Sequence, residues 1–277
     1  MDGVRATLNY LAPGSARNRL YVAPGDYLAT ARYEPRTVRI DSGRACREEF
    51  TLDRTGFTLL DHRSAVADLS DTARLDEVYT PEALDLVRRL TGADHAVSLG
   101  WMLRRSAPDR NGALPPAPDV HVDLHTTAIA RRYAEVHAKS PLPGRAYRRA
   151  VYTSLWRAFS PPPQDWPLAL CDYRSVDDAE GSPNLLFRVS SLPGPDEAAD
   201  AADDSEAESA ASVFGYRPAH RWWYFPDMHA GEALIIKLHD TDRSVAWRAP
   251  HTSFHDAAAS GAHPRESIEL RSVAFFW

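Results

Sequence analysis

The C-terminal third of the chain carries four closely spaced segments with the character of β-strands. They are 221–228 (RWWYFPDM), 232–240 (EALIIKLHD), 244–254 (SVAWRAPHTSF) and 265–276 (RESIELRSVAFF), punctuated by Gly, Asp and Pro. Short strands at this spacing are typical of an antiparallel sandwich or a jelly roll. The 21 prolines in 277 residues also favour many loops and edges over a helical bundle. We therefore expect a mainly β fold with flanking helices.

Two helices are expected within this β-rich pattern. The first covers 81–91, with Thr80 as N-cap, Pro81 at the first helical position and Gly92 just past the end. The second begins at a cap supplied by Thr126 or Thr127 and runs to about residue 139. Between these helices, 120–125 (VHVDLH) alternates apolar and polar residues like a strand.

The chain divides into two parts that we expect to form one integrated domain. Residues 1–105 predict an α/β N-terminal extension that packs on a core formed by residues 106–277. Within the core, the segment 195–211 holds seven acidic residues with no basic and no aromatic residue, and this composition predicts a mobile loop or lid.

Composition excludes several classes of protein. With 32 basic and 38 acidic residues the net charge is −6, which argues against a non-specific nucleic-acid binder. No stretch approaches the roughly 20 apolar residues of a membrane helix, and the start lacks the layout of a signal peptide. Cys46 and Cys171 form no CxxC pair. GxGxxG, GxxxxGK[ST], GxSxG and HExxH are absent. We expect a cytoplasmic protein with no membrane partner.

The segment 120–125 also carries the first chemical motif. On a strand, His121, Asp123 and His125 point to one face. An imidazole and a carboxylate two residues apart on one face have chelate spacing for an octahedral metal, with a third ligand from elsewhere. Taken alone the HxD pattern is weak, because chance gives roughly one or two matches in a chain of this composition.

A second group of residues strengthens the metal hypothesis. His251 lies in an apolar segment, and Arg265 and Ser267 follow 14 and 16 residues later on one face of a strand. A guanidinium beside a hydroxyl is a good clamp for a carboxylate. HxD, a distant His and RxS in this order are expected of a ferrous 2-oxoglutarate oxygenase. Arg271 shares the parity of Arg265 and is the alternative clamp.

Other residues are weaker candidates. Lys237 lies inside an apolar strand, where a lysine is costly unless paired, so it is a candidate contact for the cosubstrate or an edge-strand lysine that reaches solvent. The aromatic runs are explained mostly by core packing. Candidates for binding the substrate are His125, Trp156, Arg157, which would hold a substrate carboxylate, and Tyr224.

Six stretches of the chain resemble the CmcJ/AsaB/NvfI-like family of non-haem iron, 2-oxoglutarate-dependent hydroxylases and desaturases from natural-product pathways. They are 51–71 (TLDRTGFTLLDHRSAVADLSD), 79–97 (YTPEALDLVRRLTGADHAV), 120–125, 156–176 (WRAFSPPPQDWPLALCDYRSV), 222–240 (WWYFPDMHAGEALIIKLHD) and 250–271. The resemblance implies a double-stranded β-helix (jelly-roll, cupin-like) core. By motif position it puts iron on His121, Asp123 and His251, and the cosubstrate carboxylate on Arg265.

The leading hypothesis is therefore a dioxygenase that uses Fe(II), 2-oxoglutarate and O2 to hydroxylate or desaturate a small-molecule substrate. One alternative is a cupin-type metalloenzyme that uses no 2-oxoglutarate. Another is a non-catalytic partner subunit of a biosynthetic enzyme. A homodimer or a partner enzyme of the same pathway is compatible with the leading hypothesis.

Overall fold

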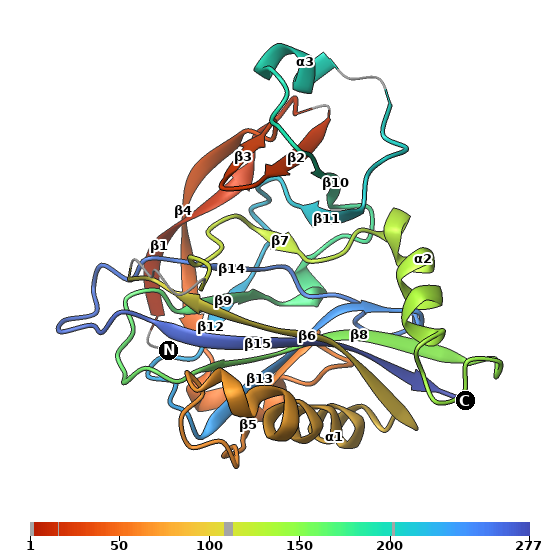
Figure 1. The fold of residues 1–277 in the computed structure, drawn as a ribbon. Coiled ribbons are helices and arrows are strands. Elements are labelled where there is room, and N and C mark those ends of the chain that lie inside the picture. Colours follow the sequence, from red (N-terminus) through yellow and green to blue (C-terminus); the bar gives the residue numbers. More distant parts are fainter. Residues whose placement is uncertain (1–2, 16, 108–112, 201–202) are drawn as a thin grey trace.

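The structure is a computed structural model that describes residues 3–15, 17–107, 113–200 and 203–277. Its strands form two sheets that face each other (Figure 1). The larger sheet has the order β1-β4-β12-β9-β14-β7-β11-β10-β2-β3. Its strands are β1 (Gly3–Leu11), β2 (Asn18–Ala23), β3 (Asp26–Ala29), β4 (Tyr33–Ser42), β7 (His121–Val122), β9 (Leu168–Cys171), β10 (Ser182–Arg188), β11 (Ser209–Val213), β12 (Trp222–Tyr224) and β14 (His251–Ser253).

The smaller sheet has the order β5-β13-β8-β15-β6 and is antiparallel throughout. Its strands are β5 (Phe57–Asp61), β6 (His95–Arg105), β8 (Arg149–Ala158), β13 (Glu232–Asp240) and β15 (Glu266–Phe276). Two strands of this sheet, β5 and β6, come from the first 105 residues, so that segment adds strands directly to the sheet formed by the C-terminal part. The predicted mainly β, double-sheet fold is confirmed.

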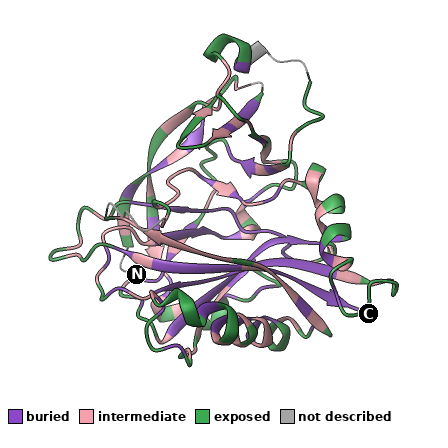
Figure 2. Cartoon of the chain, in the orientation of Figure 1, coloured by how far each residue is buried: buried purple, intermediate pink, exposed green. Residues whose placement is uncertain are grey.

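Strand alternation decides which side chains fill the space between the sheets. On β13, Leu234 and Ile236 pack in the main core between the sheets, whereas Ala233 and Ile235 pack in a second core on the outer face. This outer face is covered by α1 (Thr80–Thr91), which Figure 1 shows lying along the smaller sheet. Figure 2 shows the same division, with buried strands inside and exposed helix surfaces outside. The interior between the sheets is where a buried site can be built.

The first helix ends as predicted and begins differently. Gly92 follows α1 in the left-handed conformation at φ 72°, where glycine is favoured. At the other end, a π-helical turn (Leu75–Tyr79) leads straight into α1. Thr80 is therefore the first residue of the helix and not its N-cap, and the cap position is Tyr79. Short 3-10 helices occupy Arg44–Glu49, Thr72–Arg74 and Tyr173–Ser175.

The second helix, α2 (Thr126–His137), has a different N-cap from the one predicted, and the strand before it is shorter than predicted. The N-cap is His125, whose Nδ1 accepts a hydrogen bond from the Thr127 N–H at 3.2 Å. The preceding strand pairs only over His121–Val122, because the chain then turns to enter the helix. His125 is thus not a continuation of the strand face that carries His121.

The acidic insertion contains α3 (Pro195–Asp200), which Figure 1 shows beside β2 and β3, away from β7 and β14. Ala198 packs in a small core with Tyr21 and Phe187. Asp204 forms a 2.6 Å ion pair with the buried Arg19. Residues 201–202 of the insertion lie outside the described residues. The role of the insertion as a mobile lid stays a prediction, and so does the division of the chain at residue 105.

Candidate functional site

Three candidate metal ligands meet between the sheets. His121 lies on β7 and His251 on β14, and these two residues face each other in the register of the paired strands. Asp123 follows β7 directly. Its Oδ1 is 3.9 Å from His121 Nε2, and its Oδ2 is 3.7 Å from His251 Nε2. One ligand atom from each residue lies within 4.8 Å of the others. The structure therefore brings together the three residues that the sequence predicts.

Backbone carbonyls set the orientation of both imidazoles. His121 Nδ1 lies 2.7 Å from the Asp119 carbonyl oxygen, and His251 Nδ1 lies 3.0 Å from that of Ala249. A carbonyl can only accept, so each Nδ1 donates its proton, and in a neutral ring this leaves the Nε2 lone pair free. Burial and the neighbouring His251 lower the pKa of His121 to about 4, which keeps it neutral at pH 7. Neutral imidazoles held in this way are typical of metal ligands.

Asp123 completes a donor set that fits a metal ion. Burial alone would raise the pKa of this carboxyl group, but nearby positive charge, above all that of Arg271, lowers it to about 2. Its Oδ1 forms an ion pair with Arg271 Nη2 at 2.6 Å. Its Oδ2 is buried and finds no hydrogen-bond partner among the described residues. A buried ionised oxygen without a partner is costly, and a bound cation would satisfy it. Two imidazoles and one carboxylate are the ligands of non-haem ferrous oxygenases.

A buried cation lies in the same cavity. Arg265 and Ser253 line this cavity together with both histidines. Arg265 Nη1 donates to the Trp166 carbonyl oxygen at 2.9 Å and to Ser253 Oγ at 2.7 Å. Its Nε and Nη2, and the Oγ of Ser267, are buried without a partner in the described parts of the chain. Burial lowers the pKa of Arg265 to about 9, so the group is charged at pH 7. Unpaired guanidinium and hydroxyl donors of this kind are chemically suited to bind a carboxylate.

The inner row of β15 explains why these groups cluster. Residues 265, 267, 269 and 271 alternate with Ile268 and Leu270, which pack in the outer core. Glu269 lies in this row and lines the cavity. It binds Arg271 at 2.8 Å and lies 3.7 Å from Arg104 of β6. Glu269 and Arg104 were not among the residues that the sequence pattern predicted for the site. Parity with Arg265 could have indicated Glu269, but only the pairing of β6 with β15 places Arg104.

Neighbouring residues on β8 have different environments. Trp156 lines the cavity, with the Arg265 guanidinium 5.8 Å from its ring centre. Arg157 points to the opposite face, where it is fully buried beside Tyr79. There it donates to the backbone carbonyls of three residues in two segments, His62, Ala230 and Glu232, and to His62 Nδ1, the last at 2.7 Å. The structure thus places Trp156 at the candidate site and Arg157 outside it.

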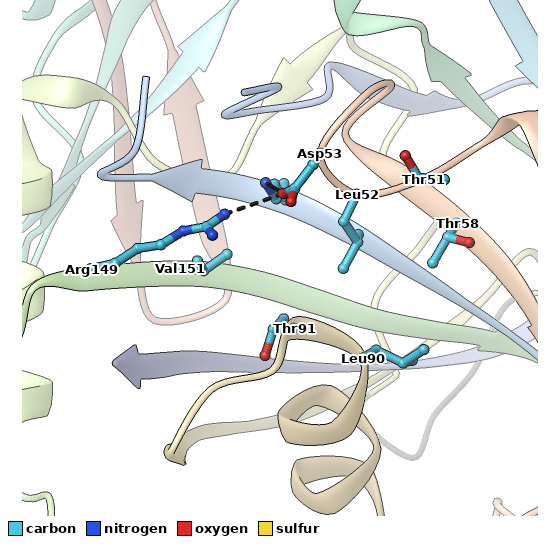
Figure 3. A pocket seen from close by; sticks show the side chains of 9 residues that line it. Thr51, Leu52, Asp53, Thr58, Leu90, Thr91, Arg149 and Val151 are labelled. Atoms are coloured by element: carbon cyan, nitrogen blue, oxygen red, sulfur yellow. Dashed lines mark hydrogen bonds and ion pairs between the residues drawn. The ribbon is translucent and has the colours of Figure 1, made fainter. Parts of the chain in front are cut away.

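Lys237 also lies away from the metal ligands. It belongs to a pocket between α1 and the outer face of the smaller sheet, and Figure 3 shows Arg149 beside Asp53 in this pocket. The Lys237 ammonium donates to Asp53 at 2.6 Å, to Asp240 at 2.7 Å and to the Ala246 carbonyl oxygen at 2.9 Å. These three acceptors use all three of its protons.

His125 and Tyr224, the last two residues predicted to contact the substrate, make contacts within the protein. His125 caps α2, and its Nδ1 also lies 2.9 Å from Thr127 Oγ1. Tyr224 is buried in the main core, where its ring meets that of Phe254 edge to face at 5.5 Å. Neither residue is among those that line the cavity beside His121 and His251.

A family profile described as an oxidoreductase/YMDC permease-like domain matches residues 8–275, nearly the whole chain. The chain belongs to this family. In the described parts of the chain, no helix combines the length and the apolar character that crossing a bilayer requires.

Two relatives of known name match most of this chain. The hydroxylase/desaturase CTB9 of Cercospora beticola is 30% identical over 265 residues, which cover 90% of this chain and 79% of the relative. The Fe(II)/2-oxoglutarate-dependent dioxygenase nvfI of Aspergillus novofumigatus is 27% identical over 263 residues, 93% of this chain and 89% of the relative. These relatives confirm the resemblance predicted from the motifs.

A solved structure shares the fold. The iron and alpha-ketoglutarate-dependent endoperoxidase NvfI matches with a TM-score of 0.82 at 24% identity. The match covers 99% of this chain and 98% of the solved chain. The arrangement of two facing sheets is therefore that of an experimentally determined protein.

Proposed function

We propose that the chain is an Fe(II)/2-oxoglutarate-dependent dioxygenase that hydroxylates or desaturates a small-molecule natural-product intermediate. The observation that carries the proposal is the cavity that joins two complementary sites. One is the triad of His121, Asp123 and His251, with a bare carboxylate oxygen. The other is the buried Arg265 with unused donors. The names of the relatives support the same class of reaction.

Each group has a defined task in this reaction. The triad would hold Fe(II), which couples oxidative decarboxylation of 2-oxoglutarate to succinate and CO2 with oxidation of a substrate C–H bond by O2. Arg265 and Ser267 would bind the distal carboxylate of 2-oxoglutarate and so orient its 2-oxo acid end. Trp156 packs beside Arg265 and helps to exclude water from this charge. The protein contributes binding, orientation and exclusion of water.

The first test is spectroscopic and anaerobic. The purified protein is reconstituted with Fe(II) and 2-oxoglutarate, and a weak visible charge-transfer band near ~500–530 nm is expected. Asp123→Ala removes one ligand and should abolish the band. Iron binding without any band would contradict the use of 2-oxoglutarate and favour a cupin-type enzyme. Failure of the wild type to bind iron would contradict the triad.

A second variant separates the two halves of the site. Arg265→Ala leaves the triad intact and removes the buried cation, so iron should still bind while the half-saturating concentration of 2-oxoglutarate rises at least tenfold. An unchanged half-saturation would contradict the clamp.

A homodimer and a partner enzyme both stay predictions, and light scattering of the purified protein tests the homodimer. Cytoplasmic location also stays a prediction.

A further inference from the structure

Arg271 occupies an unusual place for a residue that the sequence offered only as an alternative clamp. Its guanidinium lies 2.6 Å from Asp123 Oδ1 and 2.8 Å from Glu269 Oε1. It therefore binds a candidate metal ligand directly. Only one oxygen of Asp123 is engaged, because Oδ2 finds no partner within the described residues. Arg271 thus makes the two oxygens of one carboxylate different.

We propose that Arg271 is a positioning residue that makes Asp123 a one-oxygen metal ligand. With Oδ1 held by the guanidinium, only Oδ2 is presented to the ion. This inference rests on the proposed metal triad and adds a role that the triad itself does not specify. It also separates two arginines with the same parity: Arg265, directly before β15, binds the cosubstrate, and Arg271 on β15 orients a ligand.

The number of coordination positions shows why this matters. An octahedral ion bound by three single ligand atoms keeps about three open positions. A 2-oxo acid that chelates the ion takes two, which leaves one for O2. If Asp123 bound through both oxygens, only about two positions would remain, and the chelate would fill them. A carboxylate can bind a cation in either mode, so a partner on Oδ1 selects the useful mode.

Glu269 makes this arrangement compatible with a cation. A guanidinium next to a metal site repels the ion, and this repulsion would weaken binding. Glu269 contacts the same guanidinium nitrogen, Nη2, as Asp123 does, and it offsets the charge of Arg271. It also fixes the direction of the side chain from the same strand face. The alternation of acid, base and acid through Glu269, Arg271 and Asp123 therefore provides orientation with little net charge.

The test counts water molecules on a bound Mn(II) ion, with no need for turnover. Mn(II) is added without cosubstrate, and water-proton relaxation gives the number of exchangeable waters. The wild type should show about three. Arg271→Gln should show about two, because Asp123 is then free to bind through both oxygens. Arg271→Lys keeps a cation near Oδ1 and should restore about three.

Two further variants complete the design. Glu269→Gln removes the offsetting charge, so Mn(II) affinity should fall roughly tenfold while about three waters remain. Arg105→Gln removes an arginine whose Nε lies 2.8 Å from Glu266 on the same two strands, outside the metal cavity, and is the matched control. It should behave as the wild type. A thermal melt of each variant confirms that it is folded.

The outcomes separate this inference from the proposed function. If Arg271→Gln keeps about three waters and instead raises the half-saturating 2-oxoglutarate concentration, Arg271 is a cosubstrate contact and the inference is overturned. If the wild type binds Mn(II) with three waters but gives no band with Fe(II) and 2-oxoglutarate, the proposed function fails, while the water count still decides the role of Arg271. If the wild type binds no Mn(II), both are overturned.

Discussion

At the scale of single residues, neighbouring positions on one strand have different roles, because one side chain lines the cavity and the next packs outside it. Trp156 lines the cavity while Arg157 ties together loops on the outer face. Ile236 lines the cavity while Lys237 joins an ion-pair network outside it. A buried charge is therefore not by itself a sign of a binding site. What distinguishes Arg265 is that two of its donor atoms remain unused by the described residues.

Lys237→Met should lower stability and leave cosubstrate binding unchanged. The substitution strips one cation from the fully buried Asp240, and breaking a buried pair costs roughly 3 kcal/mol. Urea denaturation measures this loss, and the 2-oxoglutarate dependence of the charge-transfer band measures binding. Lys139→Met, at the exposed second lysine, is the control and should change neither. Weaker 2-oxoglutarate binding with full stability would show instead that Lys237 contacts the cosubstrate.

At the scale of elements, the short strand β7 and the start of α2 position two of the candidate metal ligands, His121 and Asp123. Pairing of β7 stops at Val122, and the chain turns within three residues into the helix. His125 supplies the hydrogen bond that an Asn, Asp or Ser commonly makes at a helix start. The turn that carries Asp123 is therefore held on one side by strand pairing and on the other by a capped helix.

His125→Ala should destabilise the protein by about 1 kcal/mol through loss of this cap. His125→Asn restores a side-chain acceptor at the same position and should recover most of the loss. Urea denaturation of the three proteins at pH 7 gives the comparison. Full stability of His125→Ala together with loss of substrate turnover would assign His125 to substrate binding instead.

At the scale of the whole molecule, the facing sheets bury polar groups that titrate when the chain unfolds. His239 is one example. Its Nδ1 lies 2.9 Å from the Tyr133 hydroxyl, and its Nε2 accepts from Arg243 at 3.0 Å. Burial, followed by the charge of Arg243, lowers the pKa of His239 from 6.5 to about 3. The folded protein therefore keeps this histidine neutral under mildly acidic conditions.

This shift predicts a loss of stability in acid. Above pH 6.5 His239 is neutral in both states and contributes no pH dependence. Below pH 6.5 the unfolded chain binds a proton that the folded chain excludes, so the free energy of unfolding falls, by about 2 kcal/mol at pH 5. The loss grows until about pH 3. His239→Gln cannot titrate, so its decrease between pH 7 and pH 5 should be about 2 kcal/mol smaller. Equal decreases, measured by urea denaturation, would contradict this contribution.

Local pattern was enough to predict much of this protein. Strand alternation indicated that Arg265, directly before β15, shares the face of Ser267, and the proline and glycine signals located the body of α1 and its end. The HxD motif and the distant histidine predicted the three residues that the structure brings together as candidate metal ligands. These predictions succeeded because side-chain alternation, helix termination and metal chelation at short spacing depend on residues close in the sequence.

The tertiary structure decided what each charged residue does. Strand parity could not distinguish Arg265 from Arg271, because both lie on the same face. Asp123 pairs with Arg271 only because the end of β7 approaches β15 across the core. Arg104 lies near Glu269 only because β6 pairs with β15. One partner of Lys237, Asp53, lies 184 positions away from it in the sequence. Such pairs are set by how sheets pack, and sheet packing depends on contacts that local pattern does not contain.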